Sequence, residues 1–166
     1  MSSRLPAAVI RSARKREPLA FWLGTWFGCG LSPVGPGTMG ALGALPLYFA
    51  VRSQGPYAIG AVALVLTIVG IWASGRVAEA TETKDPQLVV IDEAAGVMLT
   101  LAFAPPTWLG VAVAFGLFRL FDITKPPPCR WAERRLPAGY GIMLDDIFAG
   151  VWGGAVLLLA RYLGWM

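Results

Sequence analysis

The stretch YAIGAVALVLTIVGIWASG, residues 57–75, contains no charged side chain. A transmembrane α-helix needs about 20 consecutive, mostly apolar residues, so this stretch predicts one. Residues 147–165 form a second run of this kind. Shorter apolar runs lie at residues 19–28, 38–51, 88–104 and 108–121. These shorter runs require a thinned bilayer, borrowed flanking residues or burial within a bundle.

The composition agrees with a membrane protein. Hydrophobic residues make up 56% of the chain and charged residues 14%, against about 45–50% and about 25% in ordinary soluble domains. The length of 166 residues is typical of one domain. We expect an all-α, compact multi-helix membrane bundle over residues 18–166, with short or broken helices and a polar site at the cytoplasmic face, preceded by a basic cytoplasmic arm over residues 1–17.

The charges fall on one side if the N-terminus is cytoplasmic and five spans follow at 38–51, 57–75, 88–104, 108–121 and 147–165. Of the 14 Lys and Arg residues, only Arg52 and Arg161 then lie outside, as the positive-inside tendency favours. All ten acidic residues also fall inside, which that tendency does not require. The cytoplasmic face therefore has the charges expected of a site for a divalent cation and an anionic lipid headgroup.

The net charge of +4 does not indicate nucleic acid, because the positive charge lies in an N-terminal run and one loop beside apolar segments. The basic residues of the arm are expected to lie against anionic headgroups. They are Arg4, Arg11, Arg14, Lys15 and Arg16. The sequence leaves the oligomeric state open, a homo-oligomer included.

Asp92 and Glu93 interrupt the apolar run LVVIDEAAGVMLTL, residues 88–101. An ionised group at membrane depth costs at least about 2.5–3.5 kcal/mol, so it usually has a partner and a function. The alternative is that Asp92 caps a helix, but a cap explains only one of two successive carboxylates.

The stretch FRLFDITKPPPCR, residues 118–130, combines acidic and basic groups with three prolines. The prolines end the helix by Lys125, because proline lacks an amide donor. Asp122 then lies near the helix end, where Arg119 is able to pair with it. Lys125 and Arg130 flank an extended segment and are candidate phosphate ligands.

The stretch GYGIMLDDIFAG, residues 139–150, leads from a flexible glycine segment into Asp145 and Asp146. Adjacent carboxylates repel each other, and a divalent cation would offset that repulsion. The chain has no histidine and only two cysteines, so oxygen ligands favour magnesium over zinc. The candidate metal ligands and catalytic carboxylates are Asp92, Glu93, Asp122, Asp145 and Asp146.

The loop GCGLSPVGPGTMG, residues 28–40, is too rich in glycine and proline for regular structure and leads into a helix near Thr38. Amides at a helix N-terminus bind anions, so Ser32, Gly37 and Thr38 are candidate phosphate ligands. A re-entrant turn or close helix packing is equally consistent with this loop alone. Cys129 and Arg135 have the C-x5-R spacing of cysteine phosphatases, but the intervening residues contain no glycine, which disfavours that class.

Together, and in this order, four elements resemble the phosphatidylglycerophosphatase A family. They are the loop at 31–38, Asp92-Glu93-x-x-Gly96, the stretch 118–127 and Gly141-Ile-Met-x-Asp145-Asp146-x-x-Ala-Gly150. The resemblance implies an all-helical enzyme of phospholipid biosynthesis. It implies Mg²⁺-dependent hydrolysis of phosphatidylglycerophosphate to phosphatidylglycerol and phosphate at the cytoplasmic face of a bacterial inner membrane.

We hypothesise that the five carboxylates and Lys125 are catalytic, with one or two magnesium ions polarising the phosphomonoester and activating water. The substrate phosphate would contact Ser32, Gly37, Thr38, Arg119, Lys125 and Arg130. A covalent intermediate through Thr38 remains open. Two alternatives are a CDP-alcohol-type phosphotransferase, whose long aspartate pattern is missing here, and a non-enzymatic transporter or assembly subunit, whose carboxylates would be distributed through the membrane.

Overall fold

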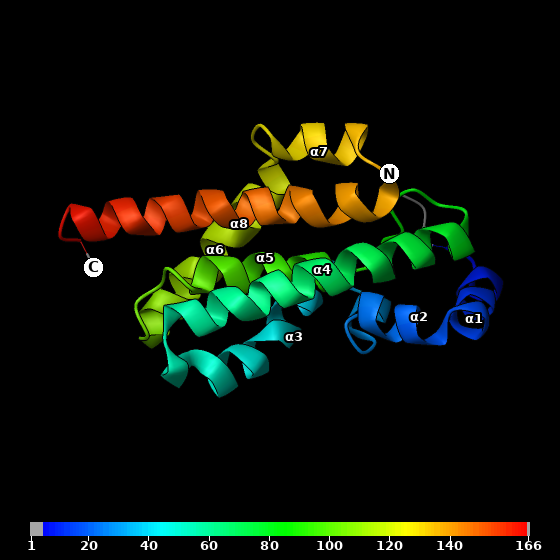
Figure 1. Ribbon diagram of the computed structural model, residues 1–166, viewed down its shortest axis with the longest axis horizontal. Helices are drawn as coiled ribbons and strands as arrows, with labels where there is room; N and C mark the ends of the chain where they lie inside the picture. Colours follow the sequence, from blue (N-terminus) through cyan, green and yellow to red (C-terminus); the bar gives the residue numbers. More distant parts are fainter. Residues whose placement is uncertain (1–4, 166) are drawn as a thin grey trace.

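The computed structural model describes residues 5–165 and is all-helical over them, as the sequence predicts. Figure 1 shows the order of the helices along the chain. They are α1 (Ala7–Arg16), α2 (Pro18–Gly24), α3 (Pro36–Val51), α4 (Pro56–Thr81), α5 (Ile91–Leu101), α6 (Trp108–Thr124), α7 (Cys129–Arg135) and α8 (Ala138–Tyr162), with short 3-10 turns at Cys29–Leu31 and Arg52–Gln54.

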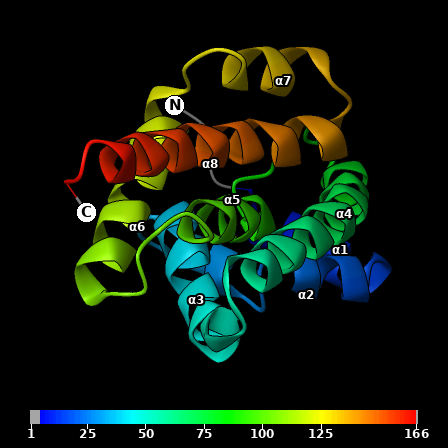
Figure 2. The ribbon, with the colours of Figure 1, turned by 60° about the vertical axis from the view of Figure 1, so that its left-hand side comes forward.

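Two helices, α4 and α8, are long and apolar enough to cross a membrane. They lie side by side and antiparallel (Figures 1 and 2). Large apolar side chains on both helices are exposed. These side chains include Leu64, Val65 and Ile68 on α4 and Val156, Leu158 and Leu159 on α8. Because apolar side chains on a membrane span face lipid, their exposure fits the predicted bundle.

Helix α8 begins earlier than the sequence predicts. The prediction of a flexible glycine segment is wrong, because Gly139 and Gly141 belong to the first turn of the helix. A Cβ atom at Gly139 would lie 2.2 Å from the Ile71 carbonyl oxygen, and one at Gly141 would lie 3.2 Å from that of Ala132. These glycines therefore permit close contact of α8 with α4 and α7.

Helix α5 lies at the centre of the bundle, in contact with α3, α4, α6 and α8 (Figure 2). It has 11 residues, which gives a length of about 16 Å at 1.5 Å per residue. The run at residues 88–104 begins in a loop, and its helix is shorter than the hydrocarbon thickness of a bilayer, so the segment reaches the opposite end of the bundle only together with residues 102–106. The apolar residues of α5 are buried by protein.

Close contact between α5 and α8 depends on two glycines. A Cβ atom at Gly96 would lie 2.7 Å from the Asp146 carbonyl oxygen, and one at Gly150 would lie 2.7 Å from the Gly96 carbonyl oxygen. The hydroxyl of Thr100 is 3.1 Å from the Gly96 carbonyl and 3.3 Å from that of Gly150. Small residues allow such backbone approach, which places the start of α5 beside Asp146.

The helices alternate in direction along the chain. The beginnings of α3, α5 and α8 and the ends of α4 and α6 therefore gather at one end of the bundle, and the segments at this end line a common cavity. Helix α1 packs on α2 and α4, with Ala13 fully buried and its basic residues exposed. The N-terminal arm is thus a docked helix from Ala7, whereas Arg4 lies outside the described residues.

We expect Gly96→Ala to reduce the free energy of unfolding by about 1–3 kcal/mol, the usual cost of overpacking a filled interior. Thermal unfolding of the protein in detergent measures this change. The matched control is Gly116→Ala on α6, where an added Cβ has no neighbour within 4 Å. Equal melting temperatures for the two variants would show that α5 and α8 are not held in this contact.

Candidate active site

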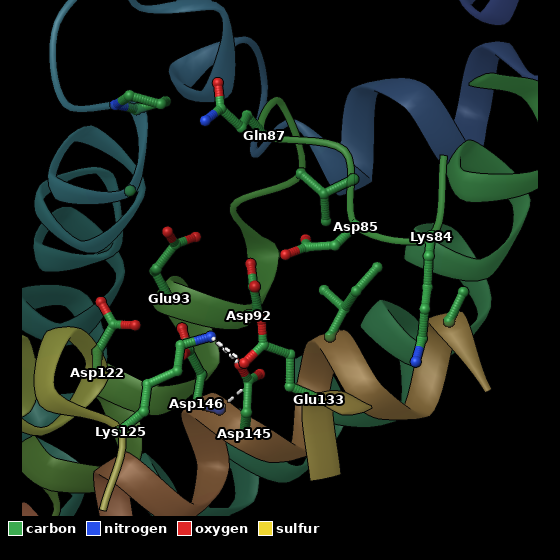
Figure 3. Close-up of a pocket in the computed structure, with 15 residues that line it drawn as sticks. Lys84, Asp85, Gln87, Asp92, Glu93, Asp122, Lys125, Glu133, Asp145 and Asp146 are labelled. Carbon is green, nitrogen blue, oxygen red and sulfur yellow. Dashed lines mark hydrogen bonds and ion pairs between the residues drawn. The ribbon is translucent and has the colours of Figure 1, made fainter. Parts of the chain in front are cut away.

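A cavity of about 270 Å³ opens at the end of the bundle where these helix ends meet (Figure 3). Most of the side chains around it are ionisable. They are Lys84, Asp85, Asp92, Glu93, Asp122, Lys125, Glu133, Asp145 and Asp146, and Pro36, Gly37 and Gln87 also line the cavity. Carboxylates from separate parts of the chain thus share one space.

Asp92 and Glu93 occupy the first turn of α5 and point into the cavity (Figure 3). The N-cap residue of α5 is Val90, and no side chain caps the helix. Asp92 Oδ1 and Glu93 Oε2 are buried without a hydrogen-bond partner among the described residues. The cap interpretation of Asp92 is therefore wrong, and the cost of burying both groups remains to be offset.

Asp145 and Asp146 are almost fully buried, with 5% and 3% of their surfaces exposed. They lie two turns inside α8, so neither is a helix cap. Asp145 Oδ1 accepts a hydrogen bond from the Asp146 amide at 3.0 Å. Asp146 Oδ2, in contrast, has no partner among the described residues.

Asp92, Glu93 and Asp146 together form a group suited to a metal ion. Each offers one carboxylate oxygen, and these oxygens all lie within 4.8 Å of one another. Each residue also has one buried oxygen without a partner. Unpaired buried carboxylates repel each other, and a hard divalent cation with oxygen ligands would remove that cost. The residues present therefore fit a magnesium ion.

Arg119 and Asp122 face each other near the end of α6, with Arg119 Nη1 2.5 Å from Asp122 Oδ2, as the sequence predicts. Gly37, in the first turn of α3, lies against the same group of charges. A Cβ atom at Gly37 would be 2.1 Å from Glu93 Oε1 and 3.2 Å from Arg119 Nη1. Any larger residue at this position would displace Glu93 or Arg119.

Lys125 provides a positive charge within the cavity. Its Nζ lies 2.6 Å from Asp145 Oδ2 and 3.2 Å from Glu133 Oε2 (Figure 3). Burial acts to lower the pKa of this ammonium, but the Asp145 and Glu133 carboxylates outweigh burial and hold it above its usual range. Lys125 therefore carries a full charge. Helix α6 ends at Thr124, before the prolines, as predicted.

Four candidate phosphate ligands do not line this cavity: Arg119, which pairs with Asp122 beside it, and Ser32, Thr38 and Arg130. Ser32 exchanges hydrogen bonds with Val34 in its own loop and lines a neighbouring cavity of about 200 Å³. Thr38 belongs to the first turn of α3, which begins at Pro36. Arg130 is exposed, and its guanidinium lies 3.3 Å from the Thr124 carbonyl oxygen. It belongs to helix α7, so the extended segment expected to reach it ends earlier.

Asp85 and Glu133 line the cavity, although the sequence does not single them out. Asp85 lies in the loop before α5, and Glu133 lies on α7. Burial raises the pKa of Asp85, and Lys125 only partly offsets this effect. In the sequence, only their charge and their position at the predicted cytoplasmic face could have indicated a role in the site. Several surface residues have the same charge and position, so these two features do not identify Asp85 and Glu133.

Cys129 does not have the features of a phosphatase nucleophile. It is 1% exposed and does not line the cavity. Burial raises the pKa of its thiol, which disfavours the thiolate that such chemistry requires. The cavity itself combines unpaired carboxylate oxygens with Lys125 and the nearby Arg119, an arrangement able to hold a cation together with an anion.

Comparison with known proteins gives a consistent result. The family model for phosphatidylglycerophosphatase A matches residues 22–161. The chain is 38% identical to phosphatidylglycerophosphatase A of Escherichia coli, covering 90% of this chain and 87% of the relative. It is 34% identical to the Haemophilus influenzae protein of the same name, covering 87% and 88%.

A Bacteroides thetaiotaomicron protein with the provisional name phosphatidylinositol-3-phosphatase is also 38% identical, covering 84% of this chain and 92% of the relative. No solved structure matches significantly. The family match covers all the helices that contribute to the cavity. The chain therefore belongs to the phosphatidylglycerophosphatase A family.

Proposed function

We propose that this protein is a magnesium-dependent lipid phosphatase that hydrolyses phosphatidylglycerophosphate to phosphatidylglycerol and inorganic phosphate in phospholipid biosynthesis. The observation that carries the proposal is the group of three buried, unpartnered carboxylate oxygens on Asp92, Glu93 and Asp146, in a cavity that Lys125 also enters. The choice of substrate in this proposal follows the names of the two relatives, both phosphatidylglycerophosphatase A.

Asp92, Glu93 and Asp146 would hold Mg²⁺, and the bound ion would supply positive charge beside the phosphoryl oxygens. Lys125, displaced in part from Asp145 and Glu133, would bind a phosphoryl oxygen as a point charge. Arg119 does not line the cavity but is held by Asp122, which does, so its charge would act on the phosphoryl group from just outside the cavity. Fixed charges of this kind stabilise a phosphoryl transition state without reorganising during the reaction.

Water is the nucleophile in this proposal. Its oxygen forms a bond to phosphorus while the bond to the glycerol oxygen breaks. A carboxylate of the cavity accepts the proton of the water, and the glycerol oxygen takes up a proton. Thr38 does not line the cavity, which favours water over a covalent intermediate through that residue.

We place the cavity at the cytoplasmic face of the bacterial inner membrane. The exposed basic residues of α1 lie at the same end of the bundle and would contact anionic headgroups. The carboxylates gather at one end, which does not fit the alternative of a transporter with carboxylates distributed through the membrane. A phosphomonoester on a lipid at this face would reach the cavity from the headgroup region.

Substitution of the carboxylates tests the site. We expect Asp92→Asn and Asp146→Asn each to reduce phosphate release by about 100-fold or more, because each removes a charge from the cation site. Phosphate release from phosphatidylglycerophosphate in detergent measures the effect. Glu82→Gln, at an exposed carboxylate outside this cavity, is the matched control and should retain activity. Full activity in both aspartate variants would exclude the carboxylate site.

Removal of the metal tests the cofactor. We expect a chelator to abolish phosphate release and added Mg²⁺ to restore it, because oxygen ligands alone form the site. The assay should compare phosphatidylglycerophosphate, phosphatidylinositol 3-phosphate, phosphatidate and a soluble phosphomonoester. Undiminished activity in chelator would contradict the magnesium dependence, and preference for another lipid would contradict the named substrate.

Substitution of Lys125 tests whether this residue contacts the phosphoryl group. We expect Lys125→Gln to reduce phosphate release by about 100-fold, since the variant loses a charged contact to the transferring group. Lys15→Gln on α1 removes an exposed charge outside the cavity and is the control. Equal activity in the two lysine variants would show that Lys125 does not bind the phosphoryl group.

A further inference from the structure

A second charged cavity lies at the opposite end of the bundle. Its volume is about 430 Å³, and both Arg52 and Arg161 line it. Arg52 follows the end of α3, and Arg161 lies in the last turn of α8. These are the two basic residues that the predicted topology leaves outside, against the positive-inside tendency. Both exceptions therefore occur at one place.

Neither arginine is neutralised by the described part of the protein. No ion pair or hydrogen bond from either side chain occurs among residues 5–165. Arg52 contacts an aromatic ring instead, with its guanidinium carbon 5.1 Å from the centre of the Phe49 ring. No acidic residue lines this cavity. Within residues 5–165, the two guanidinium groups thus have unused donors, and no acidic side chain lines their cavity.

Aromatic residues place this end of the bundle at a membrane interface. Tyr57 at the start of α4, Trp108 at the start of α6 and Tyr162 at the end of α8 are 93%, 76% and 88% exposed. Exposed Trp and Tyr side chains at the ends of membrane helices are typical of the headgroup region. In a bilayer crossed by α4 and α8, the two arginines would therefore lie at the level of lipid phosphates.

We propose that this cavity binds the phosphodiester headgroup of an anionic phospholipid in the leaflet opposite the active site. Guanidinium groups bind phosphate oxygens with paired hydrogen bonds, and both arginines line this cavity. Ile59, Ala102 and Pro105 form an apolar wall suited to the glycerol and upper acyl chain. Because no carboxylate lines the cavity among the described residues, the cation of a choline or ethanolamine headgroup would have no partner there, which disfavours these headgroups.

The site requires that α4 and α8 cross the bilayer, and it does not depend on the reaction at the other end. Native mass spectrometry of the purified protein with dioctanoylphosphatidylglycerol measures lipid retention directly. We expect Arg52→Gln combined with Arg161→Gln to weaken retention by about tenfold or more. Arg134→Gln combined with Arg135→Gln removes the same charge from α7 and should leave retention unchanged.

Three further measurements decide which ligand binds and at which cavity it binds. Dioctanoylphosphatidylcholine should bind more weakly than the anionic lipid, and inorganic phosphate should not displace it. Asp92→Asn should retain the lipid, because it alters the other cavity. Arg52→Lys combined with Arg161→Lys keeps the charge and controls for folding, with partial retention expected. Unchanged binding in the glutamine variant, equal binding of phosphatidylcholine, or displacement by phosphate would overturn the proposal.

Discussion

The repulsion among buried carboxylates is the constraint on which this structure depends. Asp92, Glu93 and Asp146 have unpaired oxygens inside a protein that offers them no compensating hydrogen bond among its described residues. Like charges in such an environment would separate if the backbone allowed it. The backbone does not, because Gly96 and Gly150 lock α5 against α8. Helix packing therefore maintains an arrangement that a bound cation would make more favourable.

The helices of the bundle have different roles. Helices α4 and α8 present apolar surfaces to the surroundings, whereas α5 is enclosed and supplies the charged turn. Helix α6 stops at Thr124, so Lys125 adopts a left-handed backbone conformation with a φ of 46°. A lysine rarely adopts this conformation, and strained residues of this kind are concentrated at functional sites. The helix ending thus sets the direction of the one lysine that contacts Asp145.

The sequence predicted the helical class, the two long apolar helices, the end of α6 and the gathering of acidic groups. These features depend on the hydropathy of consecutive residues and on the prolines that follow α6, so they can be predicted from the local sequence. The short α5, the early start of α8 and the placement of Asp85 and Glu133 depend on packing between distant segments. Arg130 and Ser32 have the chemistry of phosphate ligands, but α7 and a local hydrogen-bonded loop direct them away from the cavity.

Helix α3 begins beside the active-site cavity, which Gly37 lines, and the residue that follows its end, Arg52, lines the opposite cavity. Its 16 residues give a length of about 24 Å, less than the roughly 30 Å hydrocarbon thickness of a typical bilayer. If α3 crosses the bilayer, the lipids beside it would have to adapt to this mismatch, and local thinning would draw their headgroups toward the bilayer centre. A lipid phosphate would then be carried inward by the membrane itself, so the proposed substrate would not need to rise out of its leaflet to meet the charged turn of α5.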